Sequence, residues 1–319
     1  MPFPRPARVL CAGNISHDIL MGPVETFAWG RSNWVEDFRE EMGGNGSNTA
    51  YAMARLGVPV SLIGKVGRDA RGDALLEKLR GAGADCSHVG RAGASTTTTV
   101  VLRNRAGDRQ FVQHLGASRE VFTEPLEFTP ALLDGATHYH QANVFSLPNL
   151  RRHAGEILRR ARAAGLATSL DTGWATSGEW EEVLRPALPH CDLFLTNEDE
   201  GRAATGESQP ARMAARFREW GAGDLIIKLG PRGCAVFEAD REIPVPGFRV
   251  DAIDTTGAGD CFAGGLYAAL FRGYALAEAA RIANAAGAMT VVQAGATTGV
   301  ADWERTLAWM ARAEESSPT

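Results

Sequence analysis

The chain has 319 residues and a net charge of −5, with 45% hydrophobic and 22% charged residues. This balance is typical of a folded protein with a sizeable core, and the length favours one large domain with an appendage. Nucleic acid and anionic membranes are disfavoured as partners, because the basic residues are scattered and form no long run.

Short apolar runs alternate with helical patterns in the first part of the chain. The apolar runs predict buried strands at Val9–Ala12 and Val60–Ile63. Helical spacing predicts helices at Ser47–Leu56 and Gly72–Arg80, with Ser47 or Asn48 capping the first and Gly57 ending it.

The same alternation continues in the second part of the chain. Strands are expected at His138–Val144, Leu166–Leu170, Asp192–Leu195 and Leu225–Leu229, and helices at Leu150–Ala164, Gly259–Phe271 and Leu276–Val292. A tight turn at Gly230–Gly233 and a returning run at Cys234–Phe237 indicate a hairpin. Alternation of this kind predicts an α/β fold with a mainly parallel central sheet and helices on both faces.

Two stretches interrupt the alternation. Residues 15–43 show no good helical pattern, whereas residues 96–116 have the pattern of a strand, a turn at Arg105–Asp108 and a second strand. We expect these stretches to form a small β-sheet lid. The α/β domain would then comprise residues 1–14, 44–95 and 117–319, and the lid residues 15–43 and 96–116.

Cysteine usage favours a reducing, cytoplasmic setting. The five cysteines are odd in number and show no C-x-x-C spacing, which disfavours a disulfide framework or a zinc site. The apolar run near the N-terminus covers only Val9–Ala12, too short for a secretory signal, and no stretch approaches the roughly 20 apolar residues of a membrane span.

The segment Asp254–Asp260 carries the clearest chemistry. Gly257 and Gly259 let the backbone bend and approach a ligand, and a helical pattern follows at once, so backbone amides at a helix start could bind a phosphate. It is not a G-x-G-x-x-G motif, because Phe262 stands at the third glycine position, and no Walker A sequence occurs. Asp260 is either a helix cap or a general base, and local spacing does not decide between them.

Two segments resemble the signatures of the PfkB (ribokinase-like) family of carbohydrate kinases. Gly43–Gly57 is similar to G-G-x-x-x-N-x-A-x-x-x-x-x-L-G, and Asp254–Gly265 contains D-T-x-G-A-G-D. Weaker similarities follow in matching order at Gly13–Asp18, Asn197–Glu200, Lys228–Gly233, Asn284 and Gly295. The resemblance implies a ribokinase-like three-layer sandwich with a β-sheet lid. It also implies ATP-dependent phosphorylation of a hydroxymethyl group of a small sugar or sugar acid.

The resemblance also assigns roles to individual residues. Asp260 would be the catalytic base, and Gly257, Ala258 and Gly259 would form the anion hole. The substrate would contact Asp18, Gly44, Asn45, Asn48 and Asp260. ATP would contact Asn197, Lys228, Gly230, Gly233, Gly257, Gly259 and Asn284. Glu200 would hold Mg²⁺ through water. A monovalent cation such as K⁺ would be contacted, mostly through backbone oxygens, by Asp254, Thr256, Gly295 and Gly299.

Several alternatives stay open at this stage. The acceptor could be ribose, fructose, 2-keto-3-deoxygluconate or a nucleoside, as in an adenosine-like kinase, and a non-catalytic sugar- or nucleotide-binding regulator is a more distant reading. Asn197 and Glu200 fit a plain helix cap, and Lys228 fits a solvated strand end.

Further residues have competing interpretations. His138 and His140 share one face of a strand but lack a third metal ligand, and the aromatic residues Trp29, Trp34 and Trp174 either stack on a ligand or pack. The lid arginines are expected on a solvated hairpin, although they could meet an acidic sugar: Arg103, Arg105 and Arg109. Exposed strand edges in the lid favour a homodimer.

Overall fold

The architecture is taken from a computed structural model, which describes residues 4–27, 29–106, 108–239 and 241–315. Gly107, within the expected turn at Arg105–Asp108, lies outside the described residues. Within these ranges no helix combines the length and the apolar character needed to cross a membrane.

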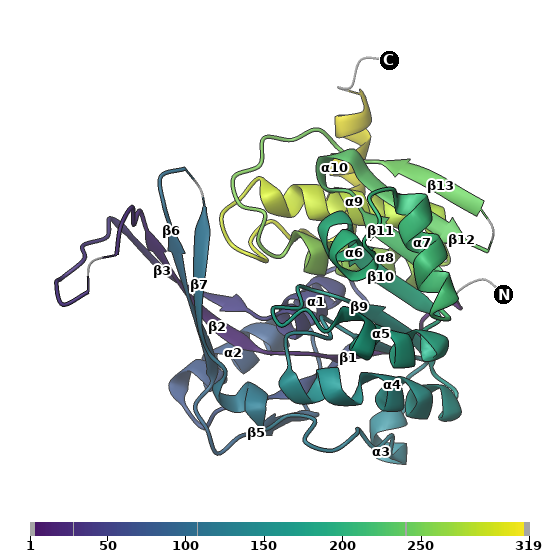
Figure 1. Cartoon of the computed structure of the whole chain (residues 1–319), viewed down its shortest axis with the longest axis horizontal. Coiled ribbons are helices and arrows are strands. Elements are labelled where there is room, and N and C mark those ends of the chain that lie inside the picture. Colours follow the sequence, from purple (N-terminus) through teal and green to yellow (C-terminus); the bar gives the residue numbers. More distant parts are fainter. Residues whose placement is uncertain (1–3, 28, 107, 240, 316–319) are drawn as a thin grey trace.

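A large sheet forms the centre of the molecule (Figure 1). Across the described residues it has nine strands in the order β13-β12-β11-β10-β9-β8-β1-β4-β5. Their bounds are β1 (Val9–Ala12), β4 (Val60–Val66), β5 (Val89–Arg91), β8 (His138–Gln141), β9 (Ala167–Asp171), β10 (Leu193–Asn197), β11 (Asp224–Lys228), β12 (Gly233–Glu238) and β13 (Arg241–Pro246). Neighbours from β11 to β5 are parallel, and β12 and β13 add an antiparallel edge. The expected mainly parallel sheet and the hairpin at Gly230–Gly233 are therefore confirmed.

Helices cover both faces of this sheet. One face packs against α1 (Asn45–Arg55), α2 (Ala70–Gly81), α8 (Ala258–Phe271), α9 (Leu276–Val291) and α10 (Trp303–Glu315), and the other against α3 (Pro130–Leu133), α4 (Pro148–Ala163), α5 (Trp180–Ala187) and α7 (Pro210–Glu219). Strand β1 shows the division, because Val9 and Cys11 lie in one core and Leu10 and Ala12 in the other. The result is a three-layer sandwich. Helix α6 (Glu198–Thr205) follows β10, and the short helices η1 (Gly116–Arg119), η2 (Leu188–His190) and η3 (Gly230–Arg232) lie in connections.

Several expected element boundaries differ by one to three residues from the structure, and in two places the backbone conformation explains the difference. Helix α1 begins at Asn45 with Gly44 as its N-cap, because Gly44 has a φ of +88° and a Cβ there would meet the Asn14 carbonyl oxygen at 2.7 Å. Ser47 lies inside the helix and donates its hydroxyl to the Gly44 carbonyl at 2.9 Å. The strand expected to reach Val144 ends at Gln141, since Asn143 has a φ of +61°.

A separate four-stranded sheet stands at one side of the sandwich, and we call it the small sheet (Figure 1). Its described strands run in the order β3-β2-β6-β7 and comprise β2 (Ser16–Gly22), β3 (Asp37–Gly43), β6 (Thr97–Arg103) and β7 (Arg109–His114). Strands β2 and β6 are parallel, and the outer strands pair antiparallel to them. Residues 15–43, which had no clear pattern, thus supply two of its strands.

Helices α1 and α8 approach closely at Gly264, and this contact gives a stability prediction. A Cβ at Gly264 would lie 2.4 Å from the Cβ of Ala52. Helix propensity alone favours Ala over Gly by about 1 kcal/mol. We expect Gly264→Ala instead to lower the free energy of unfolding by about 1–3 kcal/mol through overpacking, as measured by urea denaturation.

The matched control is Gly81→Ala at the end of α2, where no other atom lies within 4 Å of the added Cβ. This control should be neutral or stabilising. Equal stability of the two variants would show that α1 and α8 are not tightly packed at Gly264.

Candidate active site

The turn before α8 is shaped by a glycine that no other residue can replace without strain. Gly257 is the N-cap of α8 with a φ of +75°, and a Cβ there would meet the Ala296 carbonyl oxygen at 2.3 Å. The next three residues, Ala258, Gly259 and Asp260, form the first helical turn, whose backbone amides have no partner within the helix. The Ala258 amide makes a long hydrogen bond of 3.4 Å to the Thr255 carbonyl oxygen. This helix start can therefore bind an anion.

Asp260 is buried at that helix start and is held by two amides from α1. Its Oδ1 accepts from Asn45 Nδ2 at 2.8 Å, and its Oδ2 accepts from Asn48 Nδ2 at 2.9 Å. Burial raises the pKa of Asp260 to about 6, although the hydrogen bonds from Asn45 and Asn48 lower it. A carboxylate with such a pKa is ionised at neutral pH and basic enough to take a proton from a hydroxyl group.

Asn143, which the sequence did not indicate, fixes the orientation of Asn45. Its Nδ2 donates to Asn45 Oδ1 at 2.7 Å, so the amide nitrogen of Asn45 must face Asp260. Gly173 makes room for this side chain, because a Cβ there would meet Asn143 Oδ1 at 2.0 Å.

A buried group of charges lies at the carboxyl ends of the neighbouring strands β9, β10 and β11. Lys228 Nζ contacts both carboxylate oxygens of Asp171, at 2.9 and 2.8 Å. Although burial opposes it, the charges of Asp171 and Glu200 raise the pKa of Lys228. Burial raises the pKa of Glu200. Lys228 is therefore not a solvated strand end, and Asp171 is a site residue that the sequence did not indicate.

Asn197 and Glu200 form a capping box at the start of α6. Asn197 Oδ1 accepts from the Glu200 amide at 2.9 Å, and Glu200 Oε2 accepts from the Asn197 amide at 3.2 Å. The plain cap is thus present, yet both residues also line a cavity beside Asp260. Capping and ligand binding are compatible here.

Two adjoining cavities meet at this charged group. The first contains Asp260 and is lined by Asn45, Asn143, Asp171, Gly173, Asn197, Glu200, Lys228, Gly257 and Gly259. The second is a larger, mainly apolar cavity of about 350 Å³, whose lining includes Gly230, Gly233, Phe248, Phe262, Asn284 and Val291. They share Asn197, Lys228 and Gly259, so an elongated ligand could extend from one into the other.

All seven residues expected to bind ATP therefore line one or the other of these adjoining cavities. Asn284 does so while its Nδ2 donates to the carbonyls of Val245 and Pro246, both at 3.2 Å. Its side chain consequently also anchors strand β13 to helix α9.

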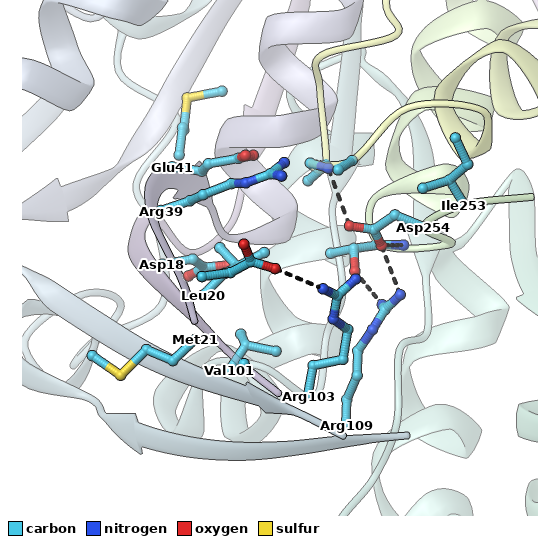
Figure 2. Close-up of a pocket in the computed structure, with 17 residues that line it drawn as sticks. Asp18, Leu20, Met21, Arg39, Glu41, Val101, Arg103, Arg109, Ile253 and Asp254 are labelled. Atoms are coloured by element: carbon cyan, nitrogen blue, oxygen red, sulfur yellow. Dashed lines mark hydrogen bonds and ion pairs between the residues drawn. The ribbon is translucent and has the colours of Figure 1, made fainter. Parts of the chain in front are cut away.

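A third cavity lies between the small sheet and the loops around Asp254 and Gly295 (Figure 2). Asp18 lines it together with Arg39 and Glu41, and Ser16 Oγ donates to Asp18 Oδ1 at 2.7 Å. Burial raises the pKa of Asp18. Asp18 and Asp260, both expected to contact substrate, thus line different cavities in this structure.

The residues expected around a monovalent cation are only partly brought together. Asp254 Oδ1 accepts from the Thr256 amide at 2.9 Å, and Asp254 Oδ2 accepts from the Gly295 amide at 3.1 Å. Gly299 does not line this cavity, and a Cβ there would meet the Met289 carbonyl oxygen at 2.2 Å, which indicates a packing role.

Arg109 also reaches Asp254, and the expectation that it is solvated is wrong. Its Nη2 lies 2.8 Å from Asp254 Oδ1, and its Nη1 donates to the Thr256 hydroxyl (Figure 2). Arg103 instead pairs with Asp37 within the small sheet, and Arg105, in the turn between β6 and β7, pairs with Glu36 just before β3.

His138 and His140, which share one face of β8, are both buried in the core. His140 Nδ1 is 2.7 Å from Ser169 Oγ, and burial lowers the pKa of His140 to about 3. Across the described ranges no group of three or more His, Cys, Asp or Glu side chains is arranged to hold a metal ion directly. Trp29 and Trp34 are each 90% exposed, and Trp174 packs edge-on against Trp180.

Comparison with known proteins identifies the family. The model of the "pfkB family carbohydrate kinase" matches residues 7–303. The chain belongs to this family. It is accordingly a phosphotransferase with an alcohol group as acceptor, and the expected fold and enzyme class are confirmed.

Two curated relatives and one solved structure illustrate the similarity of this pfkB-family chain. It is 28% identical to 2-dehydro-3-deoxygluconokinase of Bacillus subtilis, over 88% of the chain and 90% of that protein. It is 30% identical to aminoimidazole riboside kinase of Salmonella typhimurium, over 81% of the chain and 84% of that protein. The fold matches Arabidopsis thaliana ribokinase, solved with ribose and ATP, with a TM-score of 0.85 and 24% identity over 96% of this chain and 99% of that one.

The raised pKa of Asp260 predicts an acid limb in the pH profile. If the ionised carboxylate is the base, kcat/KM should fall about tenfold per pH unit below about pH 6. Because the Asn45 amide stabilises the ionised form, Asn45→Ala should move this limb to higher pH.

The control is Asn149→Ala, whose amide donates only to the backbone of Arg119 and Val121, away from the site. The acid limb of the Asn149→Ala variant should stay at the same pH as that of the wild type. A limb that Asn45→Ala leaves unmoved would argue that Asp260 is not the titrating group.

The Lys228–Asp171 pair predicts a coupled stability effect. Lys228→Met should lower the free energy of unfolding by about 3–5 kcal/mol, because it leaves buried carboxylates without their cation. The double variant Lys228→Met/Asp171→Leu should recover part of that loss, as measured by urea denaturation. A double variant less stable than Lys228→Met would contradict this account.

Proposed function

We propose that this pfkB-family enzyme transfers the γ-phosphoryl group of ATP to a hydroxymethyl group of a small sugar or sugar acid. The observation that carries the proposal is the buried Asp260 carboxylate directly beside the glycine turn at the start of α8. Asp260 accepts the hydroxyl proton, and the acceptor oxygen attacks the γ-phosphorus in line while the bond to the β,γ-bridging oxygen breaks and ADP leaves. The amides of Ala258, Gly259 and Asp260 stabilise the charge on the transferred group.

ATP is proposed to lie across the two adjoining cavities. The apolar cavity, with Gly230, Gly233 and Asn284 in its lining, suits the adenine and ribose. The phosphates would extend past Asn197 and Lys228 towards the glycine turn. A lysine at this junction offers a positive charge to the phosphate oxygens.

Glu200, next to Asp171, is the proposed Mg²⁺ residue. Carboxylate oxygens are the donors that Mg²⁺ prefers, and it usually keeps several waters, so one carboxylate acting through water fits. When bound, Mg²⁺ supplies positive charge at the phosphate oxygens. Thr172 Oγ1 donates to Glu200 Oε2 at 2.5 Å, which orients the carboxylate.

The acceptor is proposed to lie between Asp260 and the small sheet, near Gly44, Asn45, Asn48 and Asp18. The small sheet would then be a lid formed by residues 15–43 and 96–116, and the α/β domain would comprise residues 1–14, 44–95 and 117–319. Lid closure would bring Asp18 towards the acceptor and exclude water. A nucleoside acceptor is the second candidate, favoured by the similarity to aminoimidazole riboside kinase.

The lid surface also supports a proposed homodimer. Phe38, Phe111 and Val112 on the small sheet are each at least half exposed, as is Phe27 nearby. A second copy would cover these apolar side chains and the exposed strand edges. The cytoplasm is the proposed location, because all five cysteines are buried free thiols, which suits a reducing compartment.

The proposed function is tested by an ADP-release screen over sugars, sugar acids and nucleosides. Wild-type protein should release ADP rapidly with at least one acceptor and slowly without any. Asp260→Asn should lose at least about 10²-fold in kcat while keeping its circular dichroism spectrum.

Near-normal turnover by Asp260→Asn would remove Asp260 as the base. Rapid ATP hydrolysis without an acceptor would contradict the proposed exclusion of water. Acceptor-independent ATP binding with no turnover on any acceptor would instead favour a sugar- or nucleotide-binding regulator.

A further inference from the structure

Arg109 connects the small sheet to the turn that carries the catalytic residues. It is the first residue of β7, and its guanidinium contacts the Asp254 carboxylate at 2.8 Å and the Thr256 hydroxyl. The side chains of Arg109 and Asp254 are only 21% and 10% exposed. This is consequently a largely desolvated, charge-assisted contact rather than a surface ion pair.

Asp254 is the point at which two loops of the site are joined. Its carboxylate accepts from the amides of Thr256 and Gly295, which belong to different segments of the chain. Between these segments, Gly257 lies so close to Ala296 that no Cβ fits. A group that holds Asp254 thereby also holds the backbone leading into the anion hole at Gly257–Asp260.

The donor set at this position does not fit a monovalent cation while Arg109 is in place. Asp254 Oδ1, which would be a ligand, already contacts a guanidinium, and the same guanidinium donates to the Thr256 hydroxyl beside it. The nearby Val291 carbonyl oxygen accepts from the amides of Ile253 and Asp254, at 2.7 and 3.1 Å. A bound ion would have to displace these donors and stand beside a positive charge.

The other side chains that line this cavity explain why a positive charge is needed next to Asp254. Asp18, Asp37 and Glu41 line the same cavity as Asp254, so four carboxylates face a confined space (Figure 2). Three arginines also line the cavity: Arg39, Arg103 and Arg109. Arg103 pairs with Asp37 within the small sheet, whereas Arg109 is the arginine in contact with Asp254. Removing Arg109 would leave Asp254 with excess negative charge around it.

We propose that Arg109 is a tethered cation, which replaces a dissociable monovalent cation at Asp254 and couples the position of the small sheet to the anion hole. On this account the wild-type enzyme needs no K⁺, because its positive charge is part of the lid. Arg109 is a positioning residue, since it acts on the anion hole through Asp254. The link to turnover rests on the proposed function, whereas the replacement of the cation does not.

The test compares wild type, Arg109→Ala and Arg109→Gln in KCl and in choline chloride of equal ionic strength. Equal ionic strength removes general screening from the comparison, so any difference reports specific K⁺ binding. The control is Arg105→Ala, which lies in the turn before β7 and pairs with Glu36 and not with Asp254. The two readouts are the melting temperature, which requires no turnover, and kcat with the acceptor found by the screen.

Wild type and Arg105→Ala should have the same melting temperature and kcat in both salts. Both Arg109 variants should lose at least about tenfold in kcat in choline chloride, and KCl should raise their melting temperature and restore part of the rate. The glutamine variant is included because it keeps much of the side-chain volume, which separates loss of charge from loss of packing.

Two outcomes would overturn the proposal. One is a K⁺-specific rise in the melting temperature or rate of wild type, which would show that an ion binds despite Arg109. The other is Arg109 variants that behave like Arg105→Ala in both salts. If no acceptor supports turnover in wild type, the proposed function fails, yet the melting temperatures still decide whether Arg109 replaces the ion.

Discussion

The contact between Asp260 and the amides of Asn45 and Asn48 is the interaction on which the site depends. It brings the N-terminal ends of α1 and α8 together around a buried carboxylate, and burial alone would disfavour that charge. The helices can approach this closely because small residues line their contact, as at Gly264 and Ala52. The geometry of the candidate site and the packing of these helices are therefore parts of the same constraint.

Buried charges of both signs surround the proposed reaction centre. Lys228 lies among Asp171, Glu200 and, further away, Asp260, all of which raise its pKa and keep it cationic. Carboxylates and a lysine at the ends of adjacent parallel strands make a site that is polar on one side and apolar on the other. Such a division suits a nucleotide, whose base is largely apolar and whose phosphates are charged.

The small sheet contacts the loops beside this centre through a charged side chain, that of Arg109. The Arg109–Asp254 contact links a strand of the small sheet to the loops that support the glycine turn. In kinases that exclude water by closing a lid, the anion hole should be complete only when the lid is seated. The Arg109 side chain, which contacts both the small sheet and the turn, would provide a simple physical route to such coupling.

The sequence by itself determined the strand–helix alternation, the glycine turn and the family resemblance, because these depend on residues close together in the chain. It indicated Asp260 and its surrounding glycines but not Asn143, Asp171 or the role of Arg109. Each of those three makes its decisive contact with a residue far away in sequence, and local spacing carries no information about such partners. Tertiary structure alone decided that Lys228 is buried against Asp171 and that Arg109 of the small sheet pairs with Asp254, because burial and charge pairing arise only when distant segments meet.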